Sequence, residues 1–179
     1  MSKEYIFSLN NYESNDGMMT SIWGPPFWHI LHILSFNYPI TPNKKQKKSY
    51  YKFFYNLKNI LPCKSCRDNL VKNYEILPLT SEVFISRDSL SRYVYNLHEL
   101  INTMLHKKSK LTFEDVRDRY EQFRSRCLIN PNKNINDEKG CIDSLYGIKT
   151  KCVLSILPND KRIKSFKIDK KCQITNKNK

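Results

Sequence analysis

Glycine is scarce in this sequence: the 179-residue chain has four glycines, and none of them belongs to a glycine-rich loop. Such loops cradle nucleotide phosphates in P-loop and Rossmann proteins, so their absence argues against both folds. Long apolar runs are also missing, because no window approaches the roughly 18 continuous apolar residues of a membrane-spanning helix. The first 20 residues lack the apolar centre of a signal peptide. We therefore expect a cytoplasmic protein without a transmembrane segment.

Acidic residues are few relative to basic ones, since 17 Asp and Glu face 31 Lys and Arg and give a net charge of +14. Residues 131–179 alone carry twelve basic against five acidic side chains. A basic face often binds nucleic acid or an anionic surface. Lys, Asn and Ile are abundant throughout the chain, however, which favours a biased coding composition over a selected patch. Neither nucleic acid nor a membrane is the expected partner.

Apolar residues recur at helical spacing in several successive segments, whereas patterns typical of strands occur only near the C-terminus. The sequence Thr112-Phe113-Glu114-Asp115 resembles a capping box that opens the last of these segments. The pattern predicts an all-α fold, a four-helix bundle plus a short fifth helix. The expected helices cover residues 25–37, 44–61, 63–74, 88–106 and 112–126.

Composition divides the chain into three parts. An N-terminal extension, residues 1–20, precedes the helical domain, residues 21–127, and a small basic extension that contains cysteines follows at 128–179. The stretch INPNKNINDEKG is polar and rich in turn-forming residues, as expected of a linker. Beyond it, IKTKCVLSIL and RIKSFKI alternate apolar and basic residues around Pro158, a pattern that favours a β-hairpin.

The six cysteines carry the clearest chemical signal. Cys63 and Cys66 have the Cys-x-x-Cys spacing, directly after a proline and at the start of a predicted helix. A helix N-terminus stabilises a thiolate through its dipole and free N–H groups, which favours redox chemistry. A structural zinc site needs four converging ligands, and no second pair with suitable spacing is present, so no metal is expected. A thioredoxin-like site needs a βαβ setting, which the predicted helices do not provide.

Three motifs occur in a fixed order: WGPPFWHILHILSFNYP at 23–39, PCKSC at 62–66 and HELIN at 98–102. In order and spacing they resemble the helix-bundle flavin domain of the ERV/ALR family of FAD-linked sulfhydryl oxidases. The resemblance extends from about residue 23 to 123, and its specificity comes from the combination of motifs. It implies four helices and a short fifth around FAD, with the cysteine pair as a disulfide beside the flavin ring.

The resemblance also implies roles for individual residues. Cys63 and Cys66 would be catalytic, with Cys66 next to the flavin and Cys63 facing the substrate. Tyr120 stands where the family usually has a tryptophan, and Lys107 would meet the pyrophosphate, with Lys108 an equal candidate. The residues expected to bind the cofactor are Trp28, His32, Tyr38, Cys66, His98, Asn102, Lys107 and Tyr120. The implied reaction joins two thiols in a disulfide and reduces oxygen to hydrogen peroxide.

The remaining cysteines leave three alternatives open. Relatives often carry a second Cys-x-x-Cys that relays electrons, and this chain has none. Structural bridges involving Cys152 and Cys172 are the favoured interpretation. Cys127 or Cys141 could instead form a relay with wider spacing, or the four thiols could be free.

The resemblance implies protein dithiol substrates or a thioredoxin-like relay protein, molecular oxygen, and a homodimer. Several viral members of the family act in the host cytoplasm on virion proteins, so a viral origin would place this protein in the host cytoplasm or the virion. Two alternative functions are a zinc-stabilised helical interaction module and a basic nucleic-acid-binding protein with a vestigial redox domain.

Overall fold

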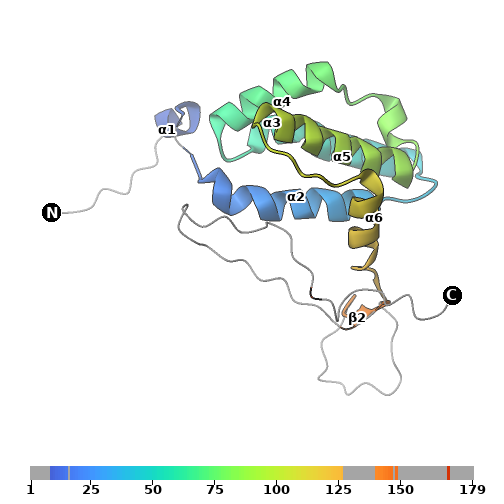
Figure 1. Cartoon of the computed structure of the whole chain (residues 1–179). Helices are drawn as coiled ribbons and strands as arrows, with labels where there is room; N and C mark the ends of the chain where they lie inside the picture. The colour runs from blue at the N-terminus through green and yellow to red at the C-terminus, as the bar shows by residue number, and fades with distance from the viewer. Residues whose placement is uncertain (1–8, 16, 127–139, 147, 149–168, 170–179) are drawn as a thin grey trace. The chain divides into compact units, whose positions relative to one another are not determined.

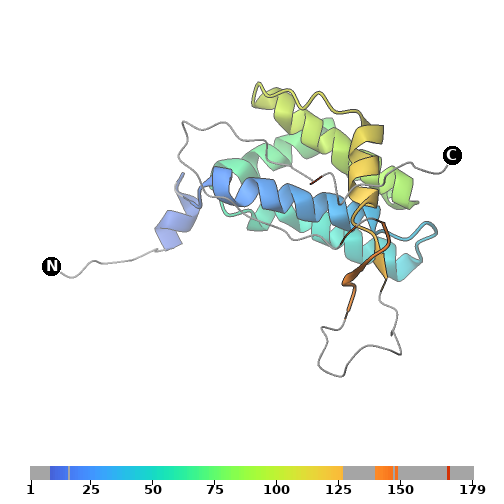
Figure 2. The same cartoon turned by 60° about the horizontal axis from the view of Figure 1, so that its bottom comes forward.

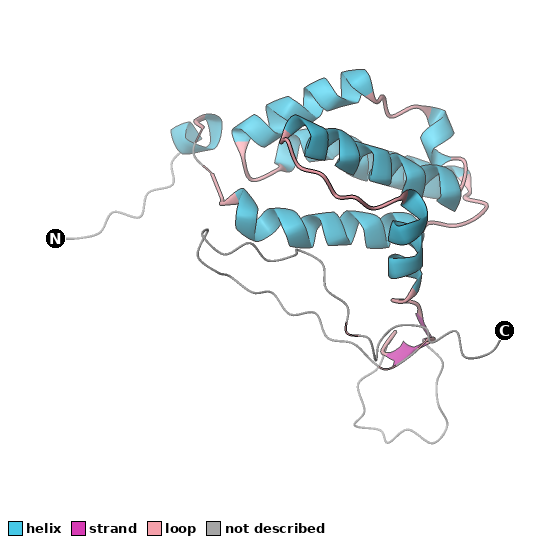
Figure 3. Ribbon diagram, in the orientation of Figure 1, coloured by secondary structure: helices cyan, strands magenta, loops and turns pink. Residues whose placement is uncertain are grey.

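The computed structural model describes residues 9–15, 17–126, 140–146, 148 and 169. These residues belong to two compact units, 1–110 and 111–179, each of which is described by itself. The elements described in the first unit are all helices, joined by loops (Figures 1 and 3). Its elements are α1 (Leu9–Glu13), α2 (Thr20–Phe36), α3 (Lys44–Ile60), α4 (Lys64–Ile76), the 3-10 helix η1 (Ser81–Phe84) and α5 (Arg87–Met104).

The four longer helices of this unit form the predicted bundle. Helix α2 packs along α5, and α3 packs along α4, while η1 contacts both α5 and α3 (Figures 1 and 2). Capping boxes begin two of these helices: Asn43 pairs with Gln46 at α3, and Ser86 pairs with Ser89 at α5. Each box satisfies backbone donors that a helix start leaves without a partner in the helix.

Helix α2 begins five residues before the start at residue 25 that the proline pair predicted. The sequence placed Pro25 in the first turn, but the helix starts at Thr20 and encloses Pro25 and Pro26. The N–H groups of Ile22 and Trp23 both donate to the carbonyl of Met19, and these bonds close the additional turn. The two prolines remove N–H donors inside the helix, so packing on α5 rather than local preference sustains it.

The core lies between the four longer helices and η1. The apolar face predicted for α5, from Leu90 to Met104, is confirmed for Leu90, Val94 and Leu97, which are at most 1% exposed and form the α5 stripe. It is wrong for Met104, which lies in the last turn of the helix and is 40% exposed. Phe54 and Leu57 of α3 meet this stripe from the other side of the core and are also buried. Buried residues that recur every three or four positions therefore define the inward faces of α3 and α5.

The second unit contains α6 (Phe113–Glu121) and a short antiparallel pair, β1 (Ser125–Arg126) with β2 (Asp143–Ser144). Its capping box at Thr112 and Asp115 is confirmed. The predicted extent of the helix is wrong, because α6 ends at Glu121 where residues to 126 were expected. The reason is that the last of those residues form β1, paired through Ser125 with Ser144.

Several expectations for the C-terminal extension fall outside the described residues. The predicted hairpin around Pro158 is one, and the roles of Cys127, Cys152 and Cys172 are others. Cys141 is described and is disulfide-bonded. The free-thiol alternative is therefore wrong for Cys141.

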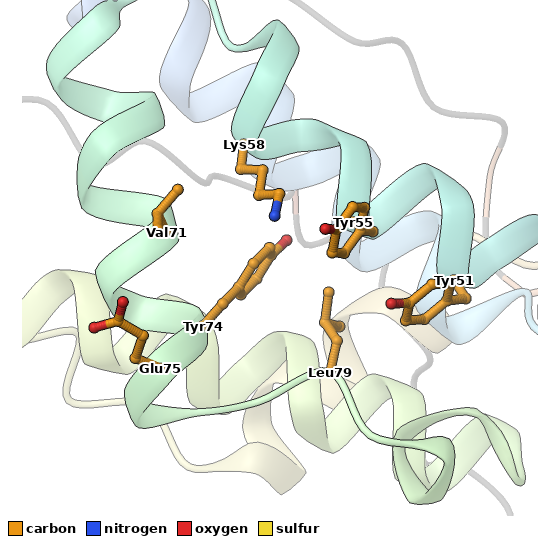
Figure 4. Close-up of a pocket in the computed structure, with 7 residues that line it drawn as sticks. All are labelled: Tyr51, Tyr55, Lys58, Val71, Tyr74, Glu75 and Leu79. Carbon is orange, nitrogen blue, oxygen red and sulfur yellow. The ribbon is translucent and has the colours of Figure 1, made fainter.

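A surface pocket of about 250 Å³ lies between α3 and α4 (Figure 4). None of the predicted cofactor residues lines it. Its lining residues are Tyr51, Tyr55, Lys58, Val71, Tyr74, Glu75 and Leu79. Within the part of the chain that the structure describes, no helix is both long enough and apolar enough to cross a membrane.

Candidate functional site

A disulfide joins Cys63 to Cys66 across the first turn of α4, with their Cα atoms 5.1 Å apart. Cys63 is the N-cap of the helix, and its Sγ accepts a hydrogen bond of 3.2 Å from the backbone N–H of Cys66. The sulfur thus takes the place of the hydroxyl or carboxylate oxygen that usually caps a helix. When the disulfide opens, the same N–H and the helix dipole stabilise a thiolate on Cys63.

Arg67, the next residue of α4, was missed by sequence reasoning. Its side chain is only 8% exposed, although arginine is almost never buried without partners. One guanidinium nitrogen donates to the Leu61 carbonyl at 2.8 Å, six residues back along the chain. Arg67 therefore ties the start of α4 to the segment that leads into Cys63. The basic residue beside the cysteine pair was the available signal, but its burial could not be read from sequence.

A second group of predicted site residues meets where α2 packs on α5. Trp28 of α2 stacks on His98 of α5, with ring centroids 3.9 Å apart and planes inclined by 3°. His32, one turn after Trp28, places its Nε2 3.1 Å from Nδ1 of His98. The spacing of four residues puts Trp28 and His32 on the same face of α2. The structure thus brings three predicted residues from two distant motifs into direct contact.

Burial keeps both imidazoles neutral. Desolvation, with smaller contributions from His98 and His29, lowers the pKa of His32 to about 3. Desolvation likewise lowers the pKa of His98 to about 4, and Lys107 adds to this effect while Glu99 opposes it. A neutral imidazole has one donor and one acceptor nitrogen, so one ring donates to the other across the 3.1 Å contact. The pair offers hydrogen-bonding groups without a net charge.

Asn102 and Lys107 lie at the C-terminal end of α5. The Asn102 side chain donates to Glu99 Oε1 at 2.9 Å, and the Asn102 backbone carbonyl accepts a hydrogen bond from the Lys107 backbone N–H at 2.8 Å. Lys107 and Lys108 are both exposed. Their ammonium groups are thus accessible to an anion, and the structure does not distinguish one from the other.

Two other residues predicted to bind the cofactor, Tyr38 and Tyr120, are buried by packing against other side chains. Tyr38 is fully buried, and its hydroxyl donates to the Phe84 carbonyl at 2.9 Å while its ring packs on Tyr50. It has no exposed surface for a ligand in this structure. Tyr120 lies on α6 in the second unit, where it is 8% exposed and meets Phe123 edge to face. The binding roles of all these residues stay predictions.

Comparison with known proteins identifies the family to which this chain belongs. A model of the Erv1/Alr family matches residues 25–121, more than half of the chain. The chain belongs to the Erv1/Alr family. The matched residues include the cysteine pair, Trp28, His32, His98 and Asn102. The resemblance proposed from the sequence motifs is therefore confirmed.

Individual sulfhydryl oxidases and a solved Erv1 structure are similar to this chain. The chain is 34% identical over 100 residues to a probable FAD-linked sulfhydryl oxidase of Acanthamoeba polyphaga mimivirus, covering 56% of this chain and 69% of that protein. It is 28% identical over 100 residues to an FAD-linked sulfhydryl oxidase of African swine fever virus, covering 56% and 81%. The crystal structure of the FAD binding domain of Erv1 from Saccharomyces cerevisiae has a TM-score of 0.52 and 25% identity, covering 57% of this chain and 94% of that one.

Metal binding receives no support from this Erv1/Alr site. Cys63 and Cys66 are bonded to each other, so neither sulfur is available as a thiolate ligand. Among the residues that the structure describes, no cluster of three or more His, Cys, Asp or Glu side chains could hold a metal ion.

Proposed function

We propose that this chain is an FAD-dependent thiol oxidase that generates disulfide bonds in protein substrates, with oxygen as acceptor and hydrogen peroxide as product. The observation that carries the proposal is the Cys63–Cys66 disulfide at the start of α4, in a domain of the Erv1/Alr family. The sulfhydryl oxidases among its relatives support the same assignment.

The residues between α2 and α5 fit a flavin nucleotide. Neutral imidazoles can exchange hydrogen bonds with ring nitrogens and hydroxyls, and the exposed Lys107 or Lys108 suits a pyrophosphate. Trp28 and His98 are already stacked at 3.9 Å, so no further ring fits between them, and they would present one shared surface. Trp28, His32, His98 and Asn102 would hold FAD. When bound, FAD supplies the two-electron acceptor that connects the reduced cysteine pair to molecular oxygen.

The chain's own cysteines carry out the exchange with substrate. A substrate thiolate attacks Cys63 Sγ, a mixed disulfide forms, and the Cys63–Cys66 bond breaks with Cys66 leaving as a thiolate. The second substrate thiol, losing its proton to solvent, then attacks the substrate sulfur of the mixed disulfide. The substrate leaves oxidised, and Cys63 leaves as a thiolate capped by the Cys66 N–H. Two electrons now reside on the cysteine pair.

The first experiment is a visible absorption spectrum of the purified protein, followed by oxygen uptake after addition of a dithiol. We expect a flavin spectrum and oxygen consumption with release of peroxide. Cys66→Ser should retain the flavin spectrum and lose turnover, because the variant cannot form the internal disulfide. A colourless protein that does not take up FAD would refute the proposal, as would full turnover in Cys66→Ser.

The partners and the location form a finer part of the proposal. We infer protein dithiols, or a thioredoxin-like relay protein, as electron donors, and a homodimer as the assembly. Viral relatives favour action in a host cytoplasm or a virion. Sedimentation of the purified chain tests the dimer. The donors are tested by mixed disulfides that form when the Cys63 thiolate of Cys66→Ser attacks the disulfide of an oxidised candidate donor and releases the donor's other sulfur as a thiolate.

A further inference from the structure

The chain segment before α2 lies against the catalytic disulfide. Gly17 pairs with Cys63 in an antiparallel β-bridge, and the N–H of Met18 donates to the Pro62 carbonyl at 2.9 Å. The Met18 carbonyl in turn accepts a hydrogen bond from the Trp23 indole at 2.9 Å. We call residues 12–15 and 17–18 the N-terminal strap. Its last two residues follow the backbone of Pro62 and Cys63 in the way that one strand follows another.

Gly17 permits this close approach. A Cβ atom at this position would lie 2.7 Å from the Pro62 carbonyl oxygen and 3.2 Å from Cys63 Cα. Both obstacles are backbone atoms, so neither can rotate away as a side chain would. Any side chain at residue 17 therefore forces the strap and the Cys63 backbone apart. The contact depends on this glycine.

The other end of the strap is anchored by the buried arginine. A guanidinium nitrogen of Arg67 donates to the Tyr12 carbonyl at 2.8 Å, and its Cζ lies 4.2 Å from the centre of the Tyr12 ring. The Tyr12 hydroxyl donates to the Asn59 carbonyl at 2.8 Å. Carbonyl acceptors and an aromatic face thus surround the arginine charge. The same side chain holds the strap and, through Leu61, the approach to Cys63.

We propose that the N-terminal strap is a specificity element that selects the thiols able to reach Cys63. This rests on the proposed function, in which Cys63 receives the substrate thiolate. Attack on a disulfide needs the incoming sulfur in line with the S–S bond, and access limits the rate. The strap occupies the backbone edge beside Cys63. Small thiols and cysteines on flexible, extended segments pass it, whereas cysteines recessed in a folded surface are hindered.

The test measures access to Cys63 directly, without turnover. The full-length chain carrying Cys66→Ser is alkylated without oxygen by N-ethylmaleimide or by a polyethylene-glycol maleimide, and modification of Cys63 is followed by peptide mass spectrometry. Gly17→Ala in this background displaces the strap. Gly24→Ala is the matched control, since a Cβ at Gly24 meets no atom within 4 Å. Tyr12→Ala releases the other anchor without adding bulk near Cys63.

Gly17→Ala and Tyr12→Ala should each accelerate the bulky reagent about fivefold, the factor expected for the loss of one hydrogen bond, and change the small reagent little. Gly24→Ala should change neither rate. Equal rates for all variants, or slower reaction of the bulky reagent in Gly17→Ala and Tyr12→Ala, overturn the proposal. If Gly17→Ala does not fold, Tyr12→Ala decides alone.

A second measurement connects the strap to turnover. With the cysteine pair intact, Gly17→Ala should raise kcat/KM for a reduced folded protein such as thioredoxin about fivefold, and leave that for dithiothreitol unchanged. A fall in kcat/KM for the folded donor would show that the strap helps to bind it and would overturn the proposal. If the wild-type chain oxidises no thiol, the oxidase function fails, while the alkylation rates still decide the strap.

Discussion

The buried histidine pair makes the stability of the fold depend on pH. Burial lowers the pKa of His32 to about 3 and that of His98 to about 4, whereas in the unfolded chain each titrates near 6.5. Below that pH the unfolded chain binds protons that the folded chain does not. The free energy of unfolding is therefore highest above about pH 6.5 and falls as the pH drops toward the folded-state pKa values.

The size of this effect follows from the two pKa values. Each histidine contributes about 1.4 kcal/mol per pH unit while only the unfolded chain is protonated. Between pH 6.5 and about pH 5 the free energy of unfolding should fall by about 1.6 kcal/mol for each histidine, because the unfolded imidazole is half protonated at the upper limit and almost fully protonated at the lower. Both folded pKa values lie below this window, so the folded chain takes up few protons within it.

Urea unfolding at several pH values measures this dependence. His32→Gln keeps a hydrogen-bonding nitrogen near the Nε2 position and should reduce the slope by about 1.4 kcal/mol per pH unit. His106→Asn is the control, because His106 is exposed and asparagine tolerates its positive φ of 54°. The control should retain the wild-type slope. Equal slopes for wild type and His32→Gln would show that the imidazole of His32 is not buried in its neutral form.

Three further predictions concern the bundle, and urea unfolding measures each. Gly24→Ala should stabilise the chain by about 0.5–1 kcal/mol, because Gly24 lies inside α2 with open space around it; a loss of stability would contradict this. Tyr93→Phe should cost about 1–3 kcal/mol, since the hydroxyl donates to the Leu77 carbonyl at 2.8 Å in the interior; Tyr51→Phe, at the surface, should cost almost nothing, and equal effects would refute the assignment. Leu97→Ala should cost about 2–5 kcal/mol, because Leu97 is 1% exposed; a cost under about 1 kcal/mol would mean that the α5 stripe is not the core.

Most of the helical fold could be predicted from local sequence. The starts of α3 and α4 and both ends of α5 lie within a few residues of the predicted bounds, and the capping box at Thr112 is present. The additional turn at the start of α2 and the early end of α6 could not be predicted. Both depend on contacts with other parts of the chain, which override the local preference of prolines and of a helical pattern.

In the candidate site, too, local spacing could be predicted from sequence, whereas contacts between distant segments could not. The Cys-x-x-Cys spacing places both cysteines at a helix start, where a thiolate is stabilised, and the family resemblance implied the disulfide between them. Tyr38 illustrates the opposite case. Its motif suggested a ligand contact, yet its hydroxyl bonds to a carbonyl 46 residues away and its side chain is fully buried. A motif specifies the residue type, while packing decides which surface that residue faces.

The sequence by itself determined the helical class, the inward faces of the helices, the cysteine pair at a helix start and the family. These properties depend on spacing within a few turns, and local backbone geometry converts that spacing directly into structure. Only the tertiary structure decided that His32 meets His98 across 66 residues, that Arg67 is buried, and that the N-terminal strap lies on Cys63. Such contacts join segments far apart in the chain, and their formation depends on the packing of the whole unit.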